Sequence, residues 1–420
     1  MKSAKARLTN RGKIFVILGA CVMAAGILLG YPDLTRIGLI LVVLPLLTLL
    51  VLPRRTPKIR VVRTVSPVRL APDERGAVEV RFTNVGERRT AVFLAEEQLH
   101  YQLGDRPRFV LPRLSAGEEK LMKYSIRSRH RGAYSLGPVL LRQRDPFGLT
   151  FLSLQLSSRT EVLVLPRLSS LGEGRVRGTS RGSEGDMPQM VASHGEDDVS
   201  IRHYRDGDEL RRVHWPATAH RGEIMVRQED RPARRRAVLL LDSRASAHPG
   251  TGVRSSFEWS VSAIGSVARH LIANGFVVHL LTDTTVRDST APDPIELDQT
   301  LTALARVQPE EDSRLDRLTA AASSFTAGGV LVVAAVVGSD EDSLRTLAAI
   351  RQPGSRALAF VIDPVKFGAA ASKDGDDVEQ SSTGVLADAG WRSVVVGPHT
   401  DIARAWAAIS GSLTSGSRSR

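Results

Sequence analysis

Two charge-free apolar stretches near the N-terminus constrain this chain most. Residues 14–31 (IFVILGACVMAAGILLGY) and 37–52 (IGLILVVLPLLTLLVL) contain no charged side chain. A helix needs about 20 mostly apolar residues to cross a bilayer, and the second stretch reaches that length with residues 34–36. The gap between the stretches lacks a small-residue cleavage site, which favours a hairpin of two spanning helices over a secretory signal peptide. Neither stretch has a polar face, and Pro45 is tolerated inside a membrane helix.

Basic residues flank the predicted hairpin at both outer ends and are nearly absent from its turn. Those that precede the first span or follow the second are Lys2, Lys5, Arg7, Arg11, Lys13, Arg54, Arg55, Lys58, Arg60 and Arg63. The turn has only Asp33 and Arg36. The positive-inside rule therefore predicts a multi-pass protein of the inner (plasma) membrane with both ends and the bulk of the chain in the cytoplasm. These residues explain much of the net charge of +12, predict contact with anionic membrane lipid and argue against a nucleic-acid partner.

The chain beyond residues 1–55 divides by its pattern into a β-rich part and an α/β part. Residues 56–167 contain the runs KIRVVRTV, AVEVRFTNV, TAVFLAEEQ, KLMKYSIRS and EVLVLPRL, which predict a small antiparallel sandwich-like region. Turns are expected at NVGERR and HRGAYSLGP, and a corner with an aromatic plug is expected at RDPFGL. Residues 168–197 are rich in Gly and Ser and indicate a linker or mobile loop.

Residues 233–415 alternate between buried-strand and helix patterns. The strand runs are RRRAVLLLDS, FVVHLLTD, GVLVVAAVVG, RALAFVIDP and WRSVVVGP, and helices are expected at 257–273, 296–307, 340–351 and 402–413. This alternation predicts an open, mostly parallel α/β sheet. Residues 368–384 indicate a surface insertion.

A polar cluster follows the first of these strands, where ligands bind in such sheets. Asp242-Ser243-Arg244-Ala245-Ser246 resembles the start of the metal-ion-dependent adhesion site of the von Willebrand factor A fold, Asp-x-Ser-x-Ser. Asp242 and Ser246 match that pattern, but Arg244 stands in place of the middle serine. A guanidinium there removes an oxygen ligand and adds a fixed positive charge, so we expect a degenerate site that holds no metal. The one cysteine, Cys21, lies inside an apolar stretch, and no cofactor is expected.

Residues 198–232 mix charged, histidine and apolar side chains. Asp208 is a plausible N-cap for a short helix from Glu209 to Trp215 that breaks or restarts at Pro216, before EIMVRQED returns as a strand. The simplest interpretation is a strand–helix–strand brace whose charges pair among themselves.

This segment carries a specific resemblance. The motif Arg202-x-Tyr204-x-x-Gly207-Asp208-x-x-Arg211-x-Val213-His214-Trp215, followed by Ala217-Thr218-Ala219 and Met225-Val226-Arg227, is similar to the signature of the domain of unknown function 58 family. Asp198 and Asp145-Pro146-Phe147-Gly148 are similar to that family as well, whereas Pro216 and His220 depart from its usual Lys and Arg. The resemblance implies a membrane-anchored bacterial protein with a degenerate von Willebrand factor A-like domain. It also implies association with a MoxR-type AAA+ ATPase or a transglutaminase-like membrane protein, because such proteins are often encoded beside members.

The leading hypothesis is a membrane-anchored, cytoplasm-facing, non-enzymatic adaptor or assembly factor. Its expected partner-binding residues are Arg202, Tyr204, Asp208, Arg211 and His214, and its expected structural residues are Gly207, Val213 and Trp215, with the two apolar ones buried. The sequence contains neither a GxxxxGK[ST] phosphate loop nor a GxSxG nucleophile motif. The alternative is an uncharacterised hydrolase-like enzyme with a site at Asp208, His214 and Asp242.

Overall fold

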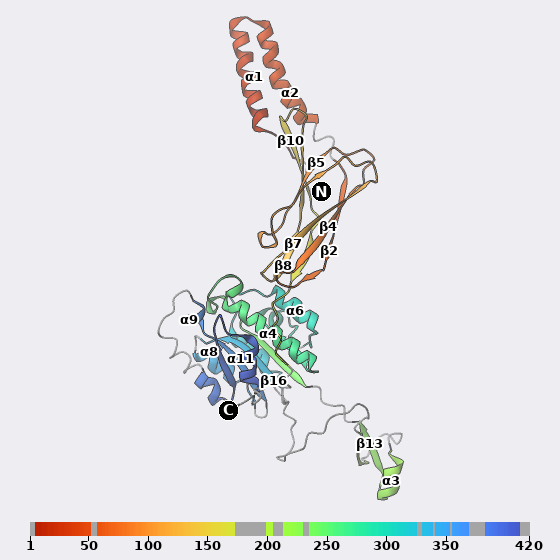
Figure 1. Ribbon diagram of the computed structural model, residues 1–420, viewed down its shortest axis with the longest axis vertical. Helices are drawn as coiled ribbons and strands as arrows, with labels where there is room; N and C mark the ends of the chain where they lie inside the picture. Colours follow the sequence, from red (N-terminus) through yellow and green to blue (C-terminus); the bar gives the residue numbers. More distant parts are fainter. Residues whose placement is uncertain are drawn as a thin grey trace, which may run out of the picture. The chain divides into compact units, whose positions relative to one another are not determined.

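The chain forms two compact units in a computed structural model (Figure 1). The residues that the structure describes are 5–51, 57–172, 199–204, 213–229, 235–291, 293–325, 330–338, 341–352, 355–368 and 383–411. One unit comprises Met1–Leu168, Thr251–Arg254 and Leu301–Gln308, and the other comprises Ser169–Gly250, Ser255–Thr300 and Pro309–Arg420. Most of the predicted loop at 168–197 and of the predicted insertion at 368–384 lies outside the described residues.

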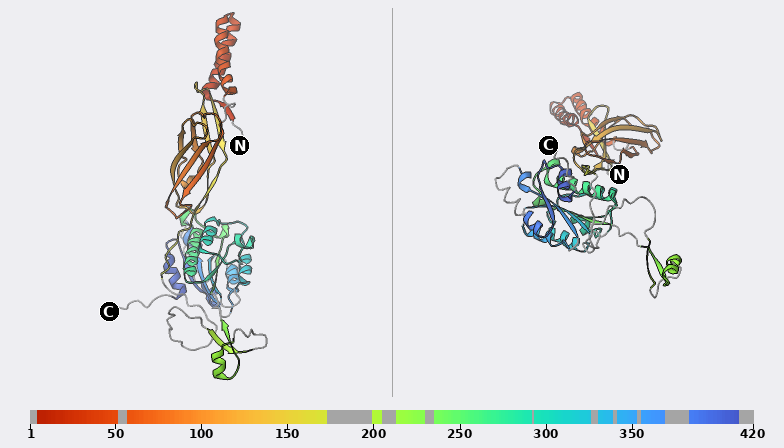
Figure 2. Two further views of the ribbon diagram at one scale, coloured as in Figure 1. Left: turned by 90° about the vertical axis from the view of Figure 1, so that its right-hand side faces the viewer. Right: turned by 60° about the horizontal axis from the view of Figure 1, so that its bottom comes forward.

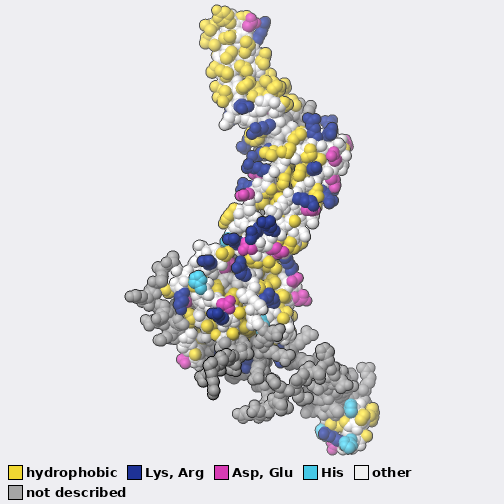
Figure 3. All heavy atoms as spheres, viewed as in Figure 1, with side chains coloured by type: hydrophobic (Ala, Val, Ile, Leu, Met, Phe, Trp, Pro, Cys, Tyr) yellow, Lys and Arg dark blue, Asp and Glu magenta, His cyan; other side chains and the backbone are white. Residues whose placement is uncertain are grey.

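A hairpin of two apolar helices opens the first unit. Helices α1 (Asn10–Leu29) and α2 (Pro32–Val51) are each long and apolar enough to cross a membrane, as the sequence predicts. Gly30 ends α1 in the left-handed conformation, and its N–H donates to the carbonyl of Gly26. In Figure 3 the surface of the hairpin is almost entirely hydrophobic, with charged side chains at its tip and basic ones around its base.

Glycines let the two helices pack closely. A Cβ added to Gly19 would lie 2.8 Å from the Cβ of Leu41, and one added to Gly38 would lie 2.5 Å from the backbone nitrogen of Met23. Small residues at such crossings allow backbones to approach and gain van der Waals contact in a medium that offers no hydrophobic drive between helices.

Helix α1 begins directly on a β-sheet, without an intervening linker. Strand β1 (Lys5–Leu8) pairs antiparallel with β10 (Thr150–Leu156). Thr9 caps the helix by accepting the N–H of Gly12 at 3.1 Å, and its hydroxyl donates to the carbonyl of Gly148 at 2.7 Å. Gly12 has no room for a side chain, since an added Cβ would lie 2.1 Å from the carbonyl oxygen of Leu149. The start of the first apolar helix is therefore fixed to the corner between β10 and the preceding strand, β9 (Val139–Arg144).

Asp145 organises that corner. Its buried carboxylate accepts the N–H groups of Leu149 and Thr150 and the Thr150 hydroxyl. Burial pushes the pKa of Asp145 upward, but the hydrogen bonds from Thr150 and Leu149 outweigh it and hold the pKa below its usual range. The predicted corner is confirmed, but the aromatic plug is wrong: Phe147 is 60% exposed.

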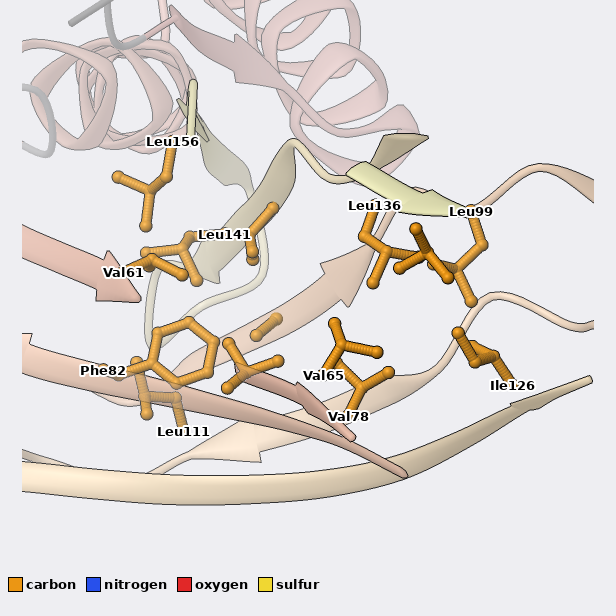
Figure 4. Packing of buried hydrophobic residues seen from close by; sticks show 14 of the residues in the cluster. Val61, Val65, Val78, Phe82, Leu99, Leu111, Ile126, Leu136, Leu141 and Leu156 are labelled. Atoms are coloured by element: carbon orange, nitrogen blue, oxygen red, sulfur yellow. The ribbon is translucent and has the colours of Figure 1, made fainter. Parts of the chain in front are cut away.

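Three sheets and a shared apolar core make up the β-rich body (Figures 2 and 4). The sheets have the orders β1-β10-β9-β5-β6, β2-β4-β7 and β3-β11-β8. Their remaining strands are β2 (Ile59–Ser66), β3 (Arg69–Leu70), β4 (Arg75–Asn84), β5 (Phe93–Glu97), β6 (Arg108–Leu111), β7 (Glu119–Arg127), β8 (Gly132–Leu136), β9 (Val139–Arg144) and β11 (Thr160–Val164). Alternate side chains point inward; Val78, Val80 and Phe82 of β4 are fully buried. The expected turn at HRGAYSLGP is wrong, because its central residues form β8 in register with β11.

The second unit contains a five-stranded parallel sheet of order β15-β14-β16-β17-β18, with helices on both faces. Ala359 and Val361 of β17 join the core formed with α7 and α8, whereas Phe360 contacts Trp259 of α4 and Trp406 of α11. The strands are β14 (Arg236–Leu241), β15 (Val277–Leu281), β16 (Leu331–Val337), β17 (Arg356–Ile362) and β18 (Arg392–Val396). The helices are α4 (Ser256–Ala273), α5 (Asp283–Arg287), α7 (Leu315–Ser323), α8 (Glu341–Ala348), α9 (Pro364–Phe367) and α11 (Ile402–Ser410). Helix α6 (Leu297–Arg306) begins in this unit, and its residues from Leu301 onward belong to the first unit. All five predicted strands and four predicted helices are confirmed; α5, α7 and α9 were not predicted.

Candidate functional site

Asp242 lies at the point where the strand order of the parallel sheet reverses, between β14 and β16. Its backbone N–H donates to Ala335 in β16 at 3.0 Å, and its Oδ2 accepts the N–H of Val337 at 3.3 Å. The residue is fully buried. Crevices at such switch points are where open α/β sheets bind ligands.

Arg244 occupies both oxygens of that carboxylate. Its Nη2 lies 2.8 Å from Oδ2 and its Nε lies 3.0 Å from Oδ1 of Asp242, while Nη1 donates to the hydroxyl of Ser343 at 3.0 Å. The Arg244 side chain is 15% exposed. Ser246 lies in the short turn Ala245–Ala247 and is exposed. Both carboxylate oxygens of Asp242 therefore accept hydrogen bonds from the Arg244 guanidinium.

His248 contacts the backbone of Asp242. Its Nε2 lies 2.9 Å from the Asp242 carbonyl oxygen, and its Nδ1 lies 3.0 Å from the Ser256 hydroxyl. A carbonyl can only accept, so Nε2 carries the proton. Burial, helped by the charge of Arg244, lowers the pKa of His248 against the opposing influence of Asp242.

A segment more than 60 residues further along the chain forms a β-bridge with Arg244 through Glu310. Glu310 pairs with the backbone around Arg244: its N–H donates to Ser243 at 2.8 Å, and its carbonyl accepts from Ala245 at 3.0 Å. The Glu310 carboxylate forms an ion pair with Arg287. Sequence reasoning missed His248, Arg287, Glu310 and Ser343, because each comes from a segment with no motif of its own.

The predicted signature segment is described in part. Strand β12 (Val199–His203) pairs antiparallel with β13 (Met225–Glu229), and Val213 forms a bridge to Val226 from the other side. Val213, Met225 and Val226 are buried, which agrees with a structural role for Val213. Gly207, Asp208, Arg211 and the side chain of Arg202 lie outside the described residues.

Helix α3 (Trp215–Arg221) begins at the residue where the predicted helix was expected to end, whereas the expected start at Glu209 lies outside the described residues. It begins at Trp215 and includes Pro216 in its first turn, where a missing N–H costs nothing. His214 is the N-cap, and its Nδ1 accepts the N–H of Ala217 at 3.2 Å. The expectation that Trp215 is buried is wrong: it is 69% exposed. Tyr204 is half-buried, and its backbone N–H donates to Ile224 at 2.9 Å.

Residues 200–354 match the family model described as Protein of unknown function DUF58. Over these residues the chain is similar to the DUF58 family. The match begins inside β12 and ends after α8, so the DUF58 segment contains both the signature and the Asp242–Arg244 ion pair. No curated protein matches the chain.

Several solved structures show a weak likeness. The CARDB domain of a Pyrococcus furiosus protein in complex with di-metal ions is 14% identical, with 26% of this chain and 89% of that chain covered and a TM-score of 0.20. The Pseudomonas fluorescens alkylpurine DNA glycosylase AlkC is 14% identical over 32% and 39% of the two chains, with a TM-score of 0.20. The putative ApaA protein from Bordetella pertussis is 15% identical over 26% and 94%, again with a TM-score of 0.20. Likenesses at this level carry no argument about fold or function.

The hydrogen bonds of Asp242 and His214 limit the chemistry that the described residues of the matched segment can perform. Asp242 is neutralised by Arg244, and the Nδ1 of His214 accepts a backbone hydrogen bond, so neither side chain is poised as the hydrolase alternative requires. Asp208 lies outside the described residues. Within the described ranges, no group of three or more His, Cys, Asp or Glu residues could hold a metal ion.

Proposed function

We propose that this chain is a membrane-anchored adaptor that faces the cytoplasm and binds a protein partner without a metal ion. In this proposal the second unit is a degenerate von Willebrand factor A-like domain and the β-rich body is a sandwich. The observation that carries it is the ion pair of Arg244 with Asp242 at the switch point. The guanidinium is part of the protein and carries the positive charge that a bound divalent cation would otherwise provide.

The signature segment supports the proposal with an exposed apolar surface. Trp215 is 69% exposed and Ile224 is 46% exposed, although the neighbouring Met225 and Val226 are buried. Tryptophan and arginine dominate the energetics of protein–protein interfaces. We therefore propose that Trp215 binds the partner instead of stabilising the fold. The other proposed partner-binding residues are Arg202, Tyr204, Asp208, Arg211 and His214.

The proposed partner is a MoxR-type AAA+ ATPase, on the strength of the family resemblance; a transglutaminase-like membrane protein is the second choice. Capture of the nucleotide-free ATPase by the full-length chain in detergent should be unchanged by EDTA. Trp215→Ala should weaken capture by roughly thirtyfold or more, because truncating an interface hot spot costs about 2 kcal/mol or more. Phe147→Ala is the matched control, since Phe147 is also an exposed aromatic residue but lies in the other unit.

Two outcomes would contradict the proposal. Loss of capture in EDTA would show a working cation site despite Arg244. A Trp215→Ala variant that melts at a much lower temperature would show that the side chain stabilises the fold rather than a complex.

A further inference from the structure

A basic groove lies on the β1-β10-β9-β5-β6 sheet at the base of α1. Its volume is about 1250 Å³. The residues that the argument uses are Arg7, Asn10, Leu94, Arg142, Arg144 and Phe151, all of which line it. None of its lining residues carries a carboxylate.

Strand register arranges these side chains in two rows across the sheet. In the row nearer the helix, Phe151 pairs with Arg7 on one side and Arg144 on the other. In the next row, Arg142 pairs with Ser153 and Leu94. Residues two apart on a strand are separated by about 7 Å, so a single small ligand can reach from Arg144 to Arg142. Among the described residues, no acidic side chain forms an ion pair with these three arginines.

The groove begins where the apolar helix begins. Thr9 and Asn10, the N-cap and the first residue of α1, are themselves part of its lining. Because Thr9 and Gly12 fix the helix to the β9–β10 corner, the groove cannot move far from the helix start. A helix of 20 residues is about 30 Å long, the thickness of the hydrocarbon core. The groove therefore opens at the level of the lipid headgroups if α1 spans the membrane.

We propose that this groove binds the headgroup of an anionic phospholipid of the surrounding membrane. The phosphate lies between Arg7 and Arg144 beside the Phe151 ring, and the rest of the headgroup extends to Arg142 and Ser153. Guanidinium groups pair with phosphate through two parallel hydrogen bonds, which gives a defined geometry rather than a diffuse attraction. The exposed Leu94 and Val110 bound the phosphate on the side of β5 and β6. This inference rests on the membrane anchoring in the proposed function.

The test uses the full-length chain in neutral detergent micelles, titrated with dihexanoyl phosphatidylglycerol and followed by calorimetry. We expect one saturable site per chain, which Arg7→Gln/Arg142→Gln/Arg144→Gln weakens about tenfold or more. The matched control, Arg106→Gln/Arg113→Gln/Arg159→Gln, removes the same charge from three exposed arginines outside the groove and should bind as the parent does. Dihexanoyl phosphatidylcholine and free glycerol phosphate should show no saturable binding.

Each contrary result has a distinct meaning. Equal weakening by the two triple variants would reduce the site to diffuse charge, and equal binding of phosphatidylcholine would remove the anionic preference; either overturns the proposal. Tight binding of free glycerol phosphate would show that the groove is a site for a soluble phosphate, and this result would also overturn the proposal. Flotation with pure phosphatidylcholine liposomes tests anchoring separately, and the groove variant should float as well as the parent. Matching circular dichroism melting curves of both triple variants exclude unfolding as the cause of lost binding.

Discussion

A single residue, Arg244, determines what the switch point of the parallel sheet can do. The sequence shows Arg244 two residues after Asp242, and the structure shows that its guanidinium neutralises this fully buried carboxylate. The contact between the guanidinium and Ser343 could not be predicted, because Ser343 is 99 residues away in sequence. Trp215 shows a limit of sequence reasoning, because the apolar character of a side chain does not by itself determine whether it is buried.

We predict that Arg244→Leu destabilises the second unit by about 3–5 kcal/mol, because it leaves the Asp242 charge buried without a partner. Asp242→Asn/Arg244→Leu should recover most of that loss, since it removes both charges. All four tryptophans belong to the second unit, so denaturation followed by their fluorescence reports on it. Equal destabilisation by the single and double variants would show that packing, not charge, is lost.

His248 should make the stability of the second unit depend on pH. Its pKa is lowered in the folded state by burial and by Arg244, against an unfolded value of about 6.5. The unfolded chain therefore binds more protons between the two values, and stability falls as pH drops below about 6.5. In fluorescence melts across this range, His248→Gln should flatten the dependence and His399→Gln, an exposed control, should not. An unchanged slope in His248→Gln would contradict the prediction.

At the scale of elements, the pattern of apolar residues predicted the strands that are buried on both faces and the two apolar helices. It missed short strands at the edges of the sheets. The strands β14 to β18 and the helices α1 and α2 are continuous apolar runs, so the sequence alone was enough to predict them. Strand β8 was hidden because Gly and Pro dominate HRGAYSLGP as turn residues, yet its Gly132, Tyr134 and Leu136 are buried against β11. Strand β1 could not be expected, because it is short and was assigned only to a basic flank.

The packing of α1 on α2 yields an element-scale prediction. Gly19→Leu would put a Cβ 2.8 Å from Leu41 and should force the helices apart, at a cost of about 1–3 kcal/mol for overpacking. Ala20→Leu is the control, because Ala20 is exposed on the same helix. On heating in detergent, the temperature at which the monodisperse peak is lost should fall by roughly 5 °C for Gly19→Leu only. Equal loss in both variants would point to a general effect of added bulk on the hairpin.

At the scale of the whole molecule, function depends on which side of the membrane the two units occupy. Every basic cluster of the hairpin lies at its outer ends, and the turn carries only the exposed pair Asp33 and Arg36. An adaptor for a cytoplasmic ATPase requires this orientation, and so does a groove at the inner leaflet. The charge bias of the flanks is the physical reason to expect it.

The sole cysteine makes that orientation measurable with little engineering. Cys21 lies within α1 and should not react with a membrane-impermeant maleimide, so Cys21→Ser gives a background for single-cysteine variants. In intact cells Asp33→Cys should be labelled, because the proposed orientation places the turn on the far side of the membrane from the two units. Arg159→Cys, in the β-rich body, should be labelled only after permeabilisation. The reverse pattern would place the units outside the cytoplasm and exclude a cytoplasmic ATPase as partner, whereas labelling of neither position before permeabilisation would mean that the hairpin does not span.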